Sequence, residues 1–161
     1  MIDATIVKAH PHAAGCLIAE QENEALGRSK GGFTTKIHAV VDALGLPVDV
    51  RLTGGNRNDI TQAEDLMKDK APRKLIGDKG YDSDAFRNML AEKGVEPVIP
   101  PREKRSNPAS YDEEAYTERH LVENFFLKIK FFRGIATRYC KTASIFLNLV
   151  KIACILAWVR I

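Results

Sequence analysis

The stretch Tyr116–Lys130, YTERHLVENFFLKIK, decides how the rest of the chain is interpreted. On a helix that turns about 100° per residue, Arg119 lies at about −60° from Tyr116, Glu123 at about −20° and Lys130 at about −40°. These four side chains therefore share one narrow polar stripe. The opposite side is apolar and consists of Leu121, Val122, Phe125, Ile129 and Phe132. The pattern predicts an amphipathic helix that buries its apolar face and presents a carboxylate between cations.

A structural interpretation of this stripe requires no function. Arg119 and Glu123 are four residues apart, which is the spacing of an ordinary helical ion pair worth about 0.3–0.5 kcal/mol. Most charged stripes on helices are simply solvated surface. The residues by themselves therefore leave open whether this stripe is a functional site or only a polar face.

The spacing Tyr, two residues, Arg, three residues, Glu, six residues, Lys resembles the signature of DDE-type transposases of bacterial insertion sequences, and it matches at all four positions. In that family the Glu is the third acidic residue of the catalytic triad. The resemblance implies that Glu123 is catalytic and that Tyr116, Arg119 and Lys130 contact DNA. It also implies that two aspartates elsewhere in the chain complete the triad.

The first nine residues, MIDATIVKA, are rich in β-branched side chains and predict a strand with Asp3 at its beginning. The segment DATIVKAHPHAAG, which starts at Asp3, resembles the first catalytic segment of the family. Two parts of the family pattern are missing: the strand residues before this aspartate and the upstream region that usually binds the terminal repeats. We therefore expect the C-terminal portion of a longer transposase, with a first strand that could be too short to pair in the sheet.

A second aspartate follows the segment RKLIG at residues 73–77, which predicts a short buried strand. Functional side chains in open α/β sheets gather at the carboxyl ends of such strands, so Asp78 is well placed. The surrounding GDKGYDS resembles the second catalytic segment of the family, and its first aspartate is Asp78. Asp82 and Asp84 are expected to have local roles at the start of a helix that ends at Gly94.

The order of the predicted elements resembles the ribonuclease H-like fold, an α/β architecture in which helices flank a mixed sheet. The other predicted elements are hairpin strands 36–43 and 46–52, a helix 60–69, an edge strand 95–100, a signature helix 112–135 and a last helix from Thr142. We expect a single DDE transposase catalytic domain over residues 1–161, with a flexible loop at 9–35 and a connector at 101–111.

Four polar positions in these connections have predicted roles. Asn58 or Asp59 is expected to cap the helix that follows it, and a supporting part of Asp59 in the site is the alternative. The connector carries Lys104 and Arg105, which could lie along DNA.

Charge is distributed unevenly along the chain, whose formal net charge is +3. Residues 124–161 contain seven of the 24 basic residues and no acidic residue, so 17 basic and 21 acidic residues precede them. A cationic C-terminal part on a mildly acidic body is typical of a surface that binds a polyanion. Lysines that only keep helices soluble would give the same count.

The cysteines and the apolar C-terminal end indicate in which cellular compartment the protein is expected. Cys16, Cys140 and Cys154 show no CxxC spacing, which favours a reducing cytosol over a zinc site or a disulfide framework. The apolar last twenty residues are interrupted by Lys151 and Arg160 and predict a buried helix rather than a membrane span. We expect a cytoplasmic protein that associates with the nucleoid of a bacterium.

Three carboxylates without a thiolate or an imidazole form a ligand set that suits Mg²⁺, with Mn²⁺ as a substitute. The resemblance implies that Asp3, Asp78 and Glu123 bind the metal, and that the enzyme cleaves DNA at terminal inverted repeats and joins the 3′-hydroxyl to target DNA. It also implies a homo-oligomer on paired ends, with no membrane partner. The alternative is a catalytically inactive, truncated DNA-binding regulator of transposition.

Overall fold

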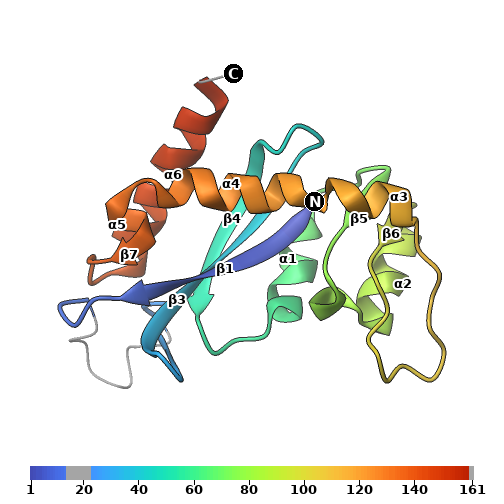
Figure 1. The fold of residues 1–161 in the computed structure, drawn as a ribbon, viewed down its shortest axis with the longest axis horizontal. Coiled ribbons are helices and arrows are strands. Elements are labelled where there is room, and N and C mark those ends of the chain that lie inside the picture. Colours follow the sequence, from blue (N-terminus) through green and yellow to red (C-terminus); the bar gives the residue numbers. More distant parts are fainter. Residues whose placement is uncertain (14–22, 160–161) are drawn as a thin grey trace.

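The computed structural model describes residues 1–13 and 23–159. Its centre is a curved mixed sheet with helices packed on both faces (Figure 1), an architecture compatible with the predicted ribonuclease H-like fold. The strands run in the order β2-β3-β1-β7, and β4 pairs with β3 on the same edge as β2. Their bounds are β1 Ile2–Ala9, β2 Gly27–Ser29, β3 Gly32–Val41, β4 Pro47–Gly54 and β7 Thr137–Arg138.

The first strand pairs along almost its whole length. β1 and β3 are antiparallel, from Ile2 opposite Val40 to Lys8 opposite Thr34, and Asp3 lies opposite Ala39. The prediction that this strand could be too short to pair is therefore wrong. The reason is that β3 is a long strand, which extends far enough to pair with the first residues of β1.

Part of the predicted loop 9–35 is strand. β2 and the beginning of β3 form a tight hairpin, in which Gly32 adopts a φ of 97° that favours glycine. The buried hydroxyls of Thr34 and Thr35 donate to backbone carbonyl oxygens of the preceding segment at 3.3 and 2.7 Å. These side-chain hydrogen bonds hold the hairpin in place. Residues 14–22 of the predicted loop lie outside the described residues.

A separate two-stranded sheet carries the second predicted aspartate. β5 and β6 are parallel and are connected through α2, which ends before Gly94, where φ is 69°, as predicted. Gly77 brings the end of β5 against β1, because a Cβ atom there would lie only 3.1 Å from Ile2 Cγ2. This close approach sets Asp78 beside the start of β1. The bounds are β5 Lys74–Ile76, η3 Lys79–Tyr81, α2 Asp84–Glu92 and β6 Glu96–Val98.

Each face of β1 packs against its own hydrophobic cluster. Val7 belongs to the cluster that includes Phe125 of α4 and Phe146 of α6. Ile2 belongs to the other cluster, with Leu66 of α1 and Phe86 of α2. The helix predicted over 60–69 is confirmed in part: the segment forms a 3₁₀ turn followed by a short α-helix. The bounds are η2 Asp59–Gln62, α1 Ala63–Met67, α4 His120–Lys130 and α6 Ala143–Val159.

The signature segment is not the single helix predicted over 112–135. Asp112 caps its start by accepting a hydrogen bond from the Ala115 N–H at 2.9 Å. A 3₁₀ turn, η4, then interrupts the α-helical winding, and the backbone becomes extended at Phe132. This break lets Ile135 enter the core and brings β7, which was not predicted, alongside β1. The bounds are α3 Glu113–Tyr116, η4 Thr117–Arg119 and α5 Arg133–Ala136.

The C-terminal part is less cationic on its surface than its composition indicates. Arg138 is fully buried and donates to the Thr35 hydroxyl at 2.7 Å and to the Lys141 carbonyl oxygen at 2.8 Å. It therefore ties β7 to β3 and to the start of α6. α6 confirms the predicted last helix. Among the helices that the structure describes, none combines the length and the apolar character needed to cross a membrane.

Candidate active site

Arg119 joins two of the three predicted acidic residues. Its Nη2 donates to Asp3 Oδ2 at 2.9 Å, and its Nη1 donates to Glu123 Oε1 at 2.5 Å. Asp3 comes from β1, whereas Arg119 and Glu123 come from η4 and α4. The 3₁₀ turn winds more tightly than an α-helix and therefore changes the direction in which Arg119 points. One guanidinium thus spans the contact between the sheet and the signature segment.

Asp78 lies at the same end of β1. It precedes η3, and its Oδ1 accepts a hydrogen bond from the Gly80 N–H at 2.8 Å. The contact between Gly77 and Ile2 fixes this turn next to Asp3, and the charge of Asp78 acts on the ionisation of Asp3. The three acidic residues predicted from sequence therefore come from three elements that meet at the start of β1.

The environment of Asp3 disfavours its charged form. Burial raises the pKa of Asp3 to about 6. Two weaker effects lower this pKa: the Ala4 N–H donates a hydrogen bond to Oδ1 at 2.8 Å, and the charge of Arg119 lies nearby. The carboxylates of Asp78 and Asp59 add to the rise. A buried carboxyl with two acidic neighbours is electrostatically costly, and such perturbed groups concentrate at functional sites.

Asp59 is a fourth acidic residue near this cluster, and the prediction that it caps a helix is wrong. Asn58 occupies the N-cap position, without a side-chain cap, and Asp59 Oδ1 instead contacts Lys36 Nζ at 2.8 Å. The same oxygen lies 4.0 Å from His38 Nδ1. Lys36 and His38 were not predicted as site residues. Their signal in the sequence is weak: two ionisable side chains alternate on one face of an otherwise apolar strand.

Buried polar atoms without hydrogen-bond partners lie near Asp3 and its acidic neighbour Asp59. In the described ranges the buried side-chain atoms of this kind are Arg119 Nε, Tyr81 Oη, His38 Nδ1 and Asp59 Oδ1, the last of which keeps its ion pair with Lys36. Burial and then the charges of Asp59, Asp3 and Asp78 raise the pKa of Tyr81, so its hydroxyl lies among these carboxylates. Buried polar groups are normally satisfied, and a cluster of unsatisfied ones indicates a place for water, an ion or a substrate group.

The described residues hold no group of three His, Cys, Asp or Glu side chains arranged as a ready metal site. The guanidinium of Arg119 is bonded to both Asp3 and Glu123 and occupies the space between them. The donor chemistry nevertheless suits a hard divalent cation, since the carboxylates of Asp3 and Glu123 face the same guanidinium and Arg119 Nε lacks a hydrogen-bond partner among the described residues.

The other predicted DNA-binding residues have contacts within the protein. Lys130 Nζ donates to Thr5 Oγ1 at 2.6 Å, and burial lowers the pKa of this lysine. The Tyr116 ring packs edge-on against Tyr111, with 5.6 Å between ring centroids. Tyr116 lies close enough to Arg119, Asp78 and Asp3 for their charges to act on its hydroxyl, whereas Lys130 contacts β1 further along, at Thr5.

The connector at 101–111 is held by hydrogen bonds to Asp82, just before α2. Asp82 was expected to act locally at the start of α2, but Ser83 holds the N-cap position. The buried Asp82 carboxylate instead accepts hydrogen bonds from Arg87 at 2.8 Å, from Arg105 at 2.7 Å and from the Arg102 N–H at 2.9 Å. Arg105, which could lie along DNA by its sequence context, therefore holds the connector against α2.

Comparison with known proteins bears on the family to which this chain belongs. Residues 1–158 match the protein family described as "Transposase DDE domain". A protein of Brucella ovis named as a candidate transposase for insertion sequence element IS6501 is 40% identical over 130 residues, which cover 80% of this chain and 100% of that protein. A candidate transposase for IS402 from Burkholderia cepacia is 33% identical over 136 residues, which cover 76% of this chain and 61% of that protein.

No solved structure matches the chain. The family match covers nearly every residue, and it includes the three acidic positions that meet at the start of β1. This chain therefore belongs to the DDE-type transposases of insertion sequences, a family that acts on DNA and generally uses divalent metal ions.

Proposed function

We propose that this chain supplies the catalytic domain that cleaves DNA at the ends of an insertion sequence and transfers the 3′-hydroxyl end into target DNA. The observation that supports this most is the meeting of Asp3, Asp78 and Glu123 around Arg119 at one end of the sheet. The protein would act on terminal inverted repeats and target DNA in the bacterial cytoplasm, at the nucleoid, as a homo-oligomer on paired ends.

In this proposal Asp3, Asp78 and Glu123 hold Mg²⁺, for which Mn²⁺ can substitute. When bound, the metal would polarise a phosphoryl oxygen and lower the cost of forming the attacking and leaving oxyanions. The raised pKa of Asp3 fits a carboxyl that is arranged for a cation partner, because a divalent ion offsets the repulsion from its acidic neighbours.

Arg119 would have two partners in turn. Without substrate it neutralises Asp3 and Glu123, as the structure shows. A guanidinium presents two parallel N–H groups that match a phosphate, so incoming DNA can draw it away from one carboxylate. Lys130 and Tyr116, on the same side of the segment, would contact the neighbouring DNA backbone.

Glu123→Gln and Asp78→Asn should each reduce Mg²⁺-dependent nicking of a duplex that carries the element's end by at least about 100-fold, because each removes a negatively charged metal ligand. The assay uses the full chain, with the exposed Asp65→Asn as the matched carboxylate-to-amide control. Undiminished nicking by either variant would exclude this site. Tight DNA binding by the wild type without any nicking would instead support the inactive regulator.

Tyr81→Phe should lower kcat by about tenfold without lowering the melting temperature. The change removes only a buried hydroxyl that has no hydrogen-bond partner among the described residues, so the described fold loses no hydrogen bond. In the working site that hydroxyl would donate to a bound water or phosphate among the carboxylates. DNA affinity is expected to stay constant, and Tyr139→Phe, on the exposed surface, is the control. A lower melting temperature with unchanged kcat would make Tyr81 purely structural.

Asp3→Asn should make the protein more stable at pH 7. Burial raises the pKa of Asp3 from 3.8 to about 6, so the folded state binds more protons than the unfolded state between these values. Stability therefore falls as the pH rises through this window. The free energy of unfolding of Asp3→Asn should exceed that of the wild type by at most roughly 3 kcal/mol at pH 7, and the difference should shrink to roughly 0.5 kcal/mol near pH 4.

Urea unfolding at the two pH values measures this difference, and Asp65→Asn should show no comparable pH dependence. If Asp3→Asn is less stable than the wild type at pH 7, the ionised Asp3 stabilises the fold and the argument from burial is incorrect.

A further inference from the structure

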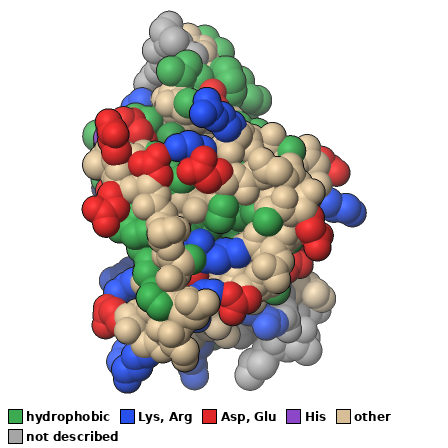
Figure 2. Space-filling model, turned by 90° about the vertical axis from the view of Figure 1, so that its right-hand side faces the viewer, with side chains coloured by type: hydrophobic (Ala, Val, Ile, Leu, Met, Phe, Trp, Pro, Cys, Tyr) green, Lys and Arg blue, Asp and Glu red, His purple; other side chains and the backbone are tan. Residues whose placement is uncertain are grey.

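α6 is apolar on nearly every side but is covered on only one. Between Ala143 and Val159 the only charged residue is Lys151. Phe146, Val150 and Ala153 pack into the core, whereas Ile152 remains 54% exposed. Figure 2 shows hydrophobic side chains gathered at the top of the molecule, near the end of α6. A helix that is apolar all round is normally covered all round, so the outward side of α6 lacks a partner among the described residues.

Five apolar residues of α6 follow a regular spacing. Ile145, Leu149, Ile152, Leu156 and Val159 are separated by four, three, four and three residues, and we call them the α6 stripe. Repeats of this kind are the seam of helices that pack knobs into holes, and they call for a partner helix with the same repeat. Ile145 is 54% exposed and Val159 is 73% exposed, so the stripe is open at both ends.

We propose that the α6 stripes of two copies of this chain pack against each other around a two-fold axis. A two-fold interface uses the same patch on both copies, and the α6 stripe is self-complementary in this sense. Ile152 is the middle of the five positions, so it faces Ile152 of the other copy whether the helices run parallel or antiparallel.

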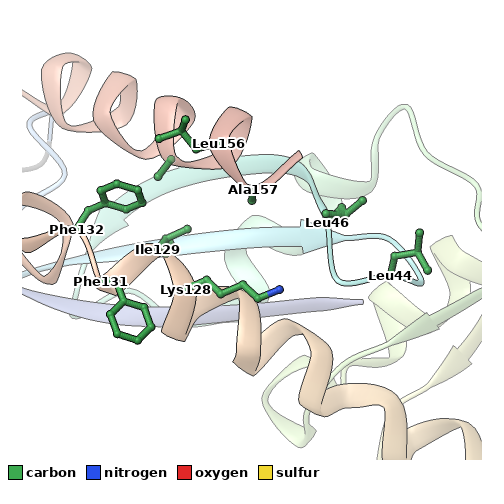
Figure 3. A pocket seen from close by; sticks show the side chains of 9 residues that line it. Leu44, Leu46, Lys128, Ile129, Phe131, Phe132, Leu156 and Ala157 are labelled. Atoms are coloured by element: carbon green, nitrogen blue, oxygen red, sulfur yellow. The ribbon is translucent and has the colours of Figure 1, made fainter. Parts of the chain in front are cut away.

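A groove beside the stripe enlarges this surface. It has a volume of about 690 Å³ and lies between α6, the end of α4 and the β3–β4 turn, where Ile129, Phe132 and Leu46 line it (Figure 3). Leu156 belongs both to the α6 stripe and to the groove lining. At the rim, Leu44 is 72% and Phe131 84% exposed. Stripe and groove together offer apolar surface on the order of 800 Å², which is what one partner contributes to a stable interface.

Charge does not oppose this pairing. The α6 stripe contains no charged residue, and Lys151 lies about 120° from its midline on the helix. The acidic cluster also remains open, since Lys130 hydrogen-bonds to β1 whereas Lys128 lines the groove, which puts the two on different sides of α4. The inference specifies the surface of the oligomer proposed above, but its test needs neither DNA nor metal and can fail independently of the catalytic proposal.

Sedimentation velocity on the full chain, at concentrations from about 1 to 100 µM, tests the pairing. The wild type should form a discrete dimer, and Ile152→Glu should weaken it by at least about tenfold, because a carboxylate would face its own copy in the seam. Lys151→Glu, one residue away on the polar side of α6, is the matched control and should dimerise like the wild type. Circular dichroism should show that both variants remain folded.

Cysteine cross-linking locates the contact. Ile152→Cys should form a disulfide-linked dimer on oxidation, whereas Lys151→Cys and the wild type should not, because a disulfide requires Cα atoms within about 7 Å. A wild type that stays monomeric at the highest concentration overturns the proposal. So does an assembly that Ile152→Glu leaves unchanged, or equal cross-linking at both positions. Monomers that bind phosphatidylcholine vesicles through this face would assign it to a lipid surface and also overturn the proposal.

Discussion

The contact of Arg119 with Asp3 and Glu123 is the interaction on which the site depends. Asp3 is 8% exposed at the start of a central strand, and a carboxylate in such a place needs a cation close by. Arg119 provides this cation from the signature segment and uses its second nitrogen to hold Glu123. The same guanidinium therefore couples the position of α4 to the position of β1. Because α4 also carries apolar residues into the core, packing and electrostatics fix this geometry together.

The buried, ionised Asp3 lowers the stability of the folded protein. Its pKa is raised by burial and by two acidic neighbours, and nearby buried polar atoms have no hydrogen-bond partners in the part of the chain that the structure describes. Two hydrophobic clusters, one on each face of β1, offset this cost. Such a division is expected where a binding site is arranged for a charged ligand that the protein alone does not supply. Unsatisfied groups at one end of a well-packed sheet are consistent with that expectation.

Much of this arrangement could be predicted from local sequence. The stripe from Tyr116 to Lys130 predicted a polar helix face with Arg119 and Glu123, and the strand patterns placed Asp3 and Asp78 at strand ends. The family resemblance then singled these residues out as site residues. Other features depend on contacts between distant segments. Lys36 meets Asp59 only because β3 and η2 come together in the fold, and the helix ends near Phe132 because Ile135 must reach the core. The periodicity of apolar residues in a local segment carries no information about these two long-range contacts. It also cannot reveal a strand of only two residues, such as β7.

The measurement that tests the central claim most directly is a titration of the full chain with Mn²⁺ in the absence of DNA, in which electron paramagnetic resonance reports the bound ion. If Asp3, Asp78 and Glu123 form one cation site around Arg119, then Asp78→Asn and Glu123→Gln should each weaken Mn²⁺ binding by about tenfold. Arg119→Ala should strengthen binding, because it frees the oxygens that the guanidinium now occupies. Equal Mn²⁺ affinity in the wild type and in all three variants would contradict the account.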